Sequence, residues 1–174
     1  MTAPPELARL FFPDPRELGR FEPVAEEALP EMVRALLAHD DHMTVTVEAW
    51  HNSLVDVHVL REHSEGDLYA RESLLLRQRD GWPVQYGIVR IDLAALPEIV
   101  RMEIESRALP LGRILIRRHV LRQVELQQLW RIEPGDRLRR MLRIGPETAE
   151  IFGRSARILV DGSPTVELLE IVAV

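Results

Sequence analysis

The stretch from Leu68 to Ile91 reads LYARESLLLRQRDGWPVQYGIVRI and carries the clearest structural signal in the chain. Two runs rich in Leu, Val, Ile and Tyr flank Asp80-Gly81. An Asp-Gly pair between such runs is typical of a tight turn that joins two antiparallel strands. We therefore expect one strand over Leu68–Gln78 and its antiparallel partner over Trp82–Ile91.

Similar turn signals recur on both sides of this hairpin. The pair Asp161-Gly162 predicts a hairpin near the end of the chain, and His51-Asn52 predicts a further turn between two alternating runs. The strands expected around these turns are Met43–Trp50, Ser53–Glu62, Ile151–Val160 and Pro164–Val172. Hairpin connections favour antiparallel pairing.

Helical patterns separate the strands. Apolar residues recur near the 3.6-residue period in three segments, which are Pro23–Ala38, Asp92–Arg107 and Arg137–Arg143. Arg113–Arg118 predicts a helical turn, and His119–Trp130 predicts a strand or a mixed element. Clustered strands with inserted helices indicate an α+β fold with a single antiparallel sheet, rather than alternating βαβ units. One face of such a sheet is free to carry a pocket roofed by the helices.

Composition limits the classes of protein that this chain can belong to. Its 174 residues suit one domain spanning 1–174, in which residues 1–39 carry no recognisable motif. Without cysteine, a disulfide scaffold, a cysteine nucleophile and a thiolate metal site are excluded. No apolar run approaches the roughly 20 residues that span a membrane. We expect a cytoplasmic protein with no membrane partner, and its oligomeric state stays open.

The charge pattern argues against a nucleic-acid partner. All 22 basic residues are arginine, they face 28 acidic residues, and the formal net charge is −6. Residues 108–143 hold nine arginines against three acids, but few aromatic residues accompany them. A solvated basic helix face explains this stretch better than a nucleic-acid patch.

Common catalytic and cofactor motifs are missing. The chain has no P-loop, no G-x-G-x-x-G and no G-x-S-x-G. The run His39-Asp40-Asp41-His42 matches no zinc-site spacing, and residues of this kind near a helix end usually cap the helix. We expect no metal and no nucleotide cofactor.

Two charged residues interrupt strands that are otherwise apolar. Arg71 lies in the Leu68–Gln78 run and Glu170 lies in the last strand. In a half-solvated strand such a charge usually points to water, so the pattern leaves both a surface role and a binding role open. Glu167 and Glu170 are separated by an odd number of residues, so only one of them faces the core.

Four ordered blocks in the chain resemble the chorismate pyruvate-lyase family, whose members form 4-hydroxybenzoate. The resemblance covers about residues 40–174. Its blocks are Asp41-His42-Met43-Thr44 with Glu48 and Val59-Leu60-Arg61-Glu62; Arg71-Glu72 with Asp80-Gly81-Trp82; Pro110-Leu111-Gly112-Arg113-Ile114-Leu115; and Gly153-Arg154-Ser155 with Asp161-Gly162-Ser163-Pro164 and Glu170.

This resemblance implies a sheet of about six antiparallel strands, with helices on one side enclosing a ligand pocket. It implies no metal and no organic cofactor. Met43 is expected to line the pocket, and Arg71 to bind a carboxylate of an aromatic or cyclohexadienyl ligand. The backbone of Leu111 is expected to contact the ligand, and Glu170 to face its ring hydroxyl.

A family member of this kind would eliminate pyruvate from chorismate without a cofactor, with Arg71 and Glu170 as catalytic residues. Substitution of Arg71 by Ala would then abolish turnover, and Glu170→Gln would impair it more than Glu167→Gln. The family's second arginine falls near Tyr86, and Arg90 is the candidate replacement.

A non-catalytic domain that binds a small carboxylate is the alternative. Ligand-sensing domains of some transcription regulators have the same fold. The proline-broken residues 1–39 show no helix-turn-helix, which makes a DNA-binding regulator the weaker form of this alternative.

Overall fold

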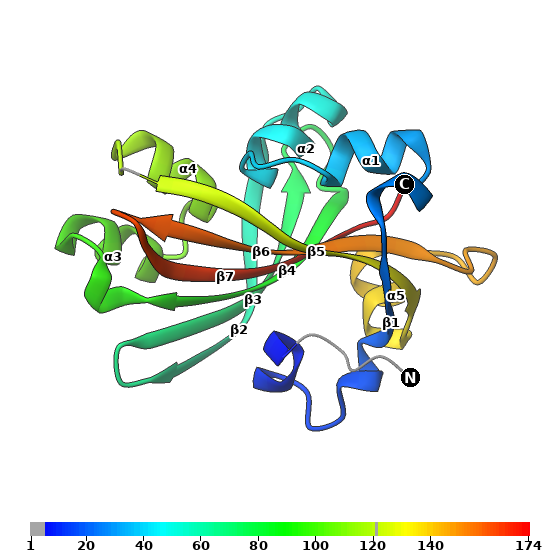
Figure 1. Ribbon diagram of the computed structural model, residues 1–174, viewed down its shortest axis with the longest axis horizontal. Coiled ribbons are helices and arrows are strands. Elements are labelled where there is room, and N and C mark those ends of the chain that lie inside the picture. Colours follow the sequence, from blue (N-terminus) through cyan, green and yellow to red (C-terminus); the bar gives the residue numbers. More distant parts are fainter. Residues whose placement is uncertain (1–5, 121) are drawn as a thin grey trace.

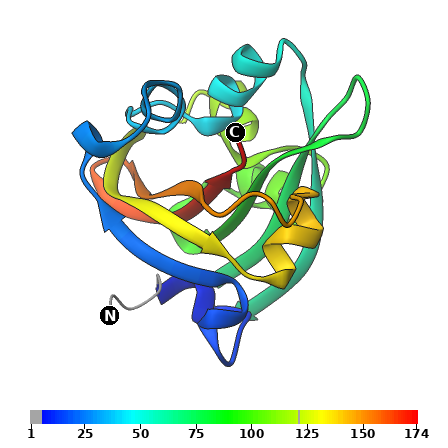
Figure 2. The same cartoon turned by 90° about the vertical axis from the view of Figure 1, so that its right-hand side faces the viewer.

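The protein is an α+β structure built on one antiparallel sheet of seven strands. The computed structural model describes residues 6–120 and 122–174. The strands lie in the order β1-β5-β6-β7-β4-β3-β2, with bounds β1 Gly19–Val24, β2 Val55–Glu65, β3 Leu68–Arg77, β4 Pro83–Asp92, β5 Arg122–Pro134, β6 Ile151–Val160 and β7 Ser163–Val172. Figure 2 shows how strongly the sheet curves.

Helices cover both faces of this sheet. They are α1 Glu31–Leu37, α2 Met43–His51, α3 Glu98–Glu105, α4 Leu111–Arg117 and α5 Asp136–Leu142, with short 3₁₀ helices η1 Glu6–Leu10, η2 Pro15–Glu17, η3 Glu26–Ala28 and η4 Leu93–Ala95. In Figure 1, α1 and α2 lie above the sheet and α3 and α4 lie at its left end, whereas α5 and the N-terminal segment lie below. The resemblance to the chorismate pyruvate-lyase family implied helices on one side only.

The two Asp-Gly hairpins form as the sequence predicts. Both Asp161 and Gly162 have positive φ, at +50° and +81°, which is the backbone that a two-residue type I′ turn requires. Asp80-Gly81 joins β3 to β4, and the Gly81 N–H donates to the Arg77 carbonyl at 2.7 Å. Because β4 pairs with β7 as well as with β3, the strands that carry Arg71 and Glu170 lie on either side of β4.

The strand predicted over Met43–Trp50 is wrong, and so is the turn predicted at His51-Asn52. This segment is helix α2, which ends at Asn52 in the left-handed conformation that commonly terminates helices. Met43 and Val47, one helical turn apart, pack into the core with α1 and the end of β3. Tertiary packing of this face overrides the β preference of the Val and Thr residues.

The helix predicted over Pro23–Ala38 is also wrong over its first part. Residues 19–24 form β1, an edge strand that pairs with β5, and helix α1 begins only at Glu31. Pro23 is tolerated there because an edge strand leaves one row of backbone groups without a sheet partner. This strand is why the sheet has seven strands rather than about six.

Three groups of buried side chains form the core. Two of them lie on the face covered by α1–α4, one under α3 and α4 and the other under α1 and α2. The third lies on the opposite face, under η1 and α5. Side chains of these two groups line the space between the helices and the sheet.

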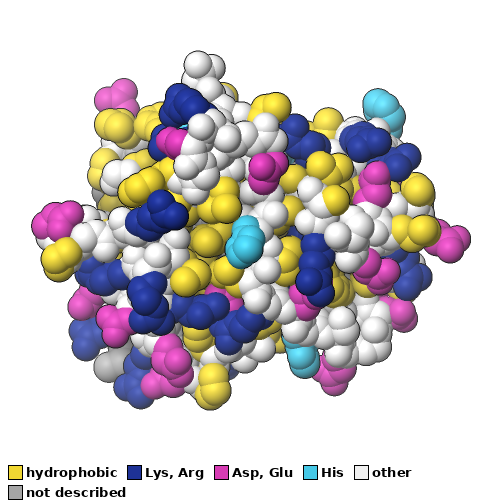
Figure 3. Space-filling view, turned by 180° about the vertical axis from the view of Figure 1, so that it is seen from behind, with side chains coloured by type: hydrophobic (Ala, Val, Ile, Leu, Met, Phe, Trp, Pro, Cys, Tyr) yellow, Lys and Arg dark blue, Asp and Glu magenta, His cyan; other side chains and the backbone are white. Residues whose placement is uncertain are grey.

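The outer surface mixes charges of both signs. Figure 3 shows acidic and basic side chains interspersed on the back of the molecule, with hydrophobic side chains exposed between them. No helix in residues 6–120 and 122–174 is long and apolar enough to cross a membrane.

Candidate functional site

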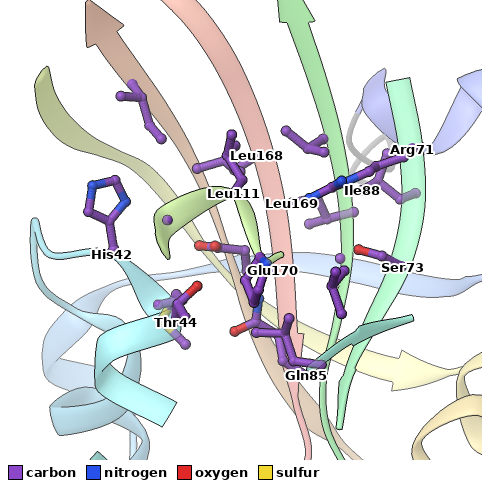
Figure 4. Close-up of a pocket in the computed structure, with 18 residues that line it drawn as sticks. His42, Thr44, Arg71, Ser73, Gln85, Ile88, Leu111, Leu168, Leu169 and Glu170 are labelled. Atoms are coloured by element: carbon purple, nitrogen blue, oxygen red, sulfur yellow. The ribbon is translucent and has the colours of Figure 1, made fainter. Parts of the chain in front are cut away.

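A cavity lies between the sheet and the helices α2 and α4. All four residues singled out from the sequence, Met43, Arg71, Leu111 and Glu170, line it. Its volume is about 60 Å³. Figure 4 shows His42 and the α2 residues on one side, Arg71 on the other, and Glu170 between them.

The register of the sheet places Arg71 and Glu170 on the same face. Arg71 lies opposite Val89 on β4, and Glu170 lies opposite Gly87. Since Gly87 and Val89 are two residues apart on one strand, their neighbours point to the same side. Gly87 has no side chain, so the space above it stays open between the two charged groups.

Arg71 is a buried cation that makes no ion pair with any residue that the structure describes. Its residue is 2% exposed, its Nη1 donates to the Ile104 carbonyl at 3.4 Å, and its Nε has no hydrogen-bond partner among the described residues. Burial lowers the pKa of Arg71, and Tyr69 and Glu62 act against this shift. A guanidinium in this position is costly in the free protein, and an anion in the cavity would offset that cost.

Glu170, in contrast, is already paired. The Arg154 Nε donates to the Glu170 Oε2 at 2.8 Å, and the Arg154 side chain is fully buried. The same guanidinium donates to the carbonyls of His39 at 2.8 Å and Asp41 at 2.9 Å, in the connection between α1 and α2. Arg154 therefore neutralises Glu170 and also holds the segment that leads into the cavity.

The sequence pattern did not indicate this role of Arg154. Arg154 belongs to the Gly153-Arg154-Ser155 block, and it interrupts an apolar strand just as Arg71 does. Arg154 and His39 lie far apart along the chain, so no local pattern indicates their contact. Strand alternation alone cannot show which buried charges pair.

Two polar side chains complete the floor of the cavity. Ser73 lies two residues after Arg71 on the same face of β3, and Gln85 precedes Gly87 on β4. The Gln85 Oε1 is buried and has no hydrogen-bond partner among the described residues. The cavity therefore offers one unused cationic donor and one unused amide oxygen, which is an acceptor.

Arg90 does not replace the family's second arginine, contrary to the candidate role that the sequence suggested. It donates to Glu167 at 2.6 Å on the opposite face of the sheet. Tyr86 also lies on that opposite face, in the core under η1 and α5. Arg154 is the second arginine on the cavity side, and it is occupied by Glu170.

The roof of the cavity is formed where α4 meets α2. Arg113 on α4 forms an ion pair with Glu48 on α2, which ties the two helices together. The contact is close at Gly112, where an added Cβ would lie 3.0 Å from the Thr44 Oγ1. A larger residue at this position would push the two helices apart.

His42 lies at the start of α2 and lines the cavity next to Met43. The Arg122 Nε donates to its Nε2 at 2.6 Å, so the neutral ring carries its proton on Nδ1. Burial, with the nearby Arg122 and Arg154 charges, lowers the pKa of His42 to about 4. His42 is therefore neutral near pH 7.

This shifted pKa predicts a loss of stability in mild acid. An unfolded histidine takes up a proton below pH 6.5, whereas the folded His42 does so only near pH 4. The contribution is fully present above pH 6.5 and is lost as the pH falls toward 4. Between pH 7 and pH 4.5 the wild-type protein should lose about 2 kcal/mol of unfolding free energy through His42. We expect His42→Gln to lack this part of the loss, as measured by denaturant titration at the two pH values.

His63→Gln is the matched control, because His63 is exposed on β2. It should keep the wild-type pH profile. If His42→Gln shows the same dependence of stability on pH as the wild type, His42 is not the cause of the stability loss in acid.

Among the described residues, no group of three or more acidic or histidine side chains is arranged to hold a metal ion. The His39-Asp40-Asp41-His42 run serves the fold instead. Its backbone carbonyls accept from Arg154, and the Asp40 Oδ1 accepts from the Leu126 N–H at 3.3 Å.

Comparisons with known proteins identify the fold. The structure is similar to that of PhnF from Mycobacterium smegmatis, with 12% identity and a TM-score of 0.54, over 75% of this chain and 63% of that chain. It is also similar to the ligand-binding domain of a protein assigned to the GntR family of transcriptional regulators from Bordetella bronchiseptica, with 10% identity and a TM-score of 0.52, over 68% of this chain and 85% of that chain. Both structures share the chorismate lyase fold, with which the sheet and helices of this chain are consistent. No model of a protein family matches the sequence, and no curated protein is similar to it.

Proposed function

We propose that this chain is a ligand-binding domain whose cavity takes a small monocarboxylate on Arg71. The observation that carries the proposal is the buried guanidinium of Arg71, which faces a cavity and has no acidic partner among the described residues. Arginine binds carboxylates through two parallel hydrogen bonds, and such bonds strengthen where water is excluded. The ligand-binding role of the Bordetella bronchiseptica domain supports the same reading.

Charge balance favours one carboxylate rather than two. Arg154 and Glu170 cancel each other, so Arg71 supplies the one net positive charge among the side chains that line the cavity, His42 being neutral. A second carboxylate would have to lie beside Glu170 or displace it from Arg154. Chorismate carries two carboxylates and fits this balance poorly.

Size and polarity narrow the ligand further. A water molecule needs roughly 10–15 Å³ of such volume, so about 60 Å³ holds a compact acid with few heavy atoms. The unpartnered Oε1 of Gln85 accepts hydrogen bonds, so it suits a hydroxyl group on the ligand.

The test is a titration of the full chain with lactate, pyruvate, benzoate and 4-hydroxybenzoate, followed by calorimetry. We expect saturable binding of at least one acid, with no binding of the matching amide, because the amide lacks the charge that Arg71 binds. The control variant is Arg90→Met, which removes an arginine from the other face of the same sheet. Equal affinity for acid and amide would refute the proposal.

Elimination of pyruvate from chorismate is the second candidate function. It is favoured by the placement of Arg71 and Glu170 on one face of the sheet, along one cavity. Pyruvate release from chorismate, followed with a coupled lactate dehydrogenase assay, separates the two candidates. Release that is lost in Arg71→Ala and kept in Arg90→Ala would establish the lyase, whereas binding of carboxylates without release supports the binding domain.

A further inference from the structure

A second, larger recess lies on the opposite face of the sheet from the cavity. Its volume is about 570 Å³. Its walls come from the N-terminal segment around Phe12, from β2 at Arg61 and from the start of α5 at Arg137. Arg16 and Arg140 also line it. Arg16 is paired with Asp14, whose Oδ2 accepts from the Arg16 Nη2 at 2.9 Å, so Arg61, Arg137 and Arg140 are the arginines available to a ligand.

A fully buried carboxylate holds two of these arginines side by side. The Arg61 Nε donates to the Glu72 Oε2 at 2.5 Å, and the Arg137 Nε donates to the Glu72 Oε1 at 2.6 Å. The Glu72 side chain has no exposed surface. One carboxylate thus compensates two guanidinium groups and leaves one positive charge over.

The outer ends of both guanidinium groups have hydrogen-bonding capacity to spare. Arg61 donates one further bond, from Nη1 to the Phe11 carbonyl at 2.9 Å, while its Nη2 is buried without a partner among the described residues. Arg137 makes its one side-chain hydrogen bond within those residues through Nε, and Arg140 makes no ion pair with any of them. A buried donor without a partner destabilises the free protein unless a bound group satisfies it.

Aromatic rings fix the orientation of these groups. The Phe12 ring centroid lies 4.8 Å from the Arg61 guanidinium carbon and 5.7 Å from that of Arg137. Rings that stack on the guanidinium faces leave the donor edges available. The acids on the rim, Glu17 and Asp136, are exposed and therefore solvated, so they oppose an anion only weakly.

From these contacts we infer that the recess is a second binding site, for a phosphate group or a small organic phosphate. A tetrahedral oxyanion presents several acceptor oxygens to donors that converge from different elements, which is how arginine clusters bind phosphate. The inference does not depend on the cavity at Arg71, because the two sites lie on opposite faces of the sheet.

The test is calorimetric titration of the full chain with inorganic phosphate and with phenyl phosphate, at an ionic strength held constant with chloride. We expect saturable binding that Arg140→Gln weakens about tenfold, since a charge-assisted hydrogen bond is lost. Glu17→Gln should tighten binding, because it removes a repelling charge from the rim. Arg140 and Glu17 are exposed and lie outside the Glu72 network, so both variants keep the fold.

Two control variants test whether the phosphate binds in the recess. Arg117→Gln removes an exposed arginine from α4 and should leave the affinity unchanged. Arg71→Met should also leave it unchanged, although it abolishes the binding proposed for the cavity. The inference is overturned if phosphate does not saturate the protein, if Arg117→Gln weakens binding as much as Arg140→Gln, or if Arg71→Met removes it.

Discussion

Arg71→Met is expected to make the free protein more stable and unable to bind its ligand. The wild-type guanidinium is buried, and its one described hydrogen bond, to the Ile104 carbonyl, is long at 3.4 Å. Replacing a buried charge by an apolar side chain of similar length removes its desolvation cost. We expect the free energy of unfolding to rise by about 1–3 kcal/mol in denaturant titrations.

The same substitution removes the group that binds the carboxylate. We expect an affinity loss of about 100-fold or more for any acid that the wild-type protein binds, because a desolvated charged pair is lost. Opposite changes in stability and affinity distinguish a binding residue from a structural one. If Arg71→Met lowers stability and keeps the affinity, Arg71 serves the fold and the proposed function fails.

Arg154→Met is expected to produce the largest loss of stability among the variants considered for this chain. It leaves the Glu170 carboxylate buried without its partner and releases the carbonyls of His39 and Asp41. Breaking a buried ion pair by removing one partner costs about 3–5 kcal/mol. Denaturant titration at pH 7 measures this loss.

A double variant distinguishes the effect of the unpaired Glu170 charge from the effect of the lost hydrogen bonds to the His39 and Asp41 carbonyls. Arg154→Met combined with Glu170→Leu removes both charges, so it should be clearly more stable than Arg154→Met alone. Arg157→Met is the matched control, because it breaks the half-exposed pair with Glu125 and should cost no more than about 1 kcal/mol. Equal losses in the single and double variants would mean that the carbonyl contacts, rather than the charge on Glu170, dominate.

Both predictions depend on the difference between two arginines that look alike in the sequence. Each interrupts an apolar strand, and each is almost completely buried. Arg154 has an acid and several carbonyls around it, whereas Arg71 has a cavity. This difference in partners makes one arginine a structural residue and the other a candidate binding residue.

The local sequence determined the two Asp-Gly hairpins and which residues of one strand share a face. Asp161 and Gly162 both have positive φ, and in the Asp80-Gly81 turn Gly81 does; glycine adopts such angles without strain, so each pair favours its turn. Alternation along β7 is equally local, and it separates Glu167 from Glu170 without any knowledge of the neighbouring strands.

Only the tertiary structure decided how the elements combine. Met43–His51 is a helix because Met43 and Val47 pack against α1 and β3, and residues 19–24 form a strand because β5 offers a partner. The same long-range packing decided three further features. Arg154 pairs with Glu170, Arg90 lies on the face of the sheet opposite the cavity, and Arg61 and Arg137 both bind Glu72. Alternation reports which residues of one strand share a face, but strand register and helix docking depend on contacts between residues far apart in the chain, which no local pattern contains.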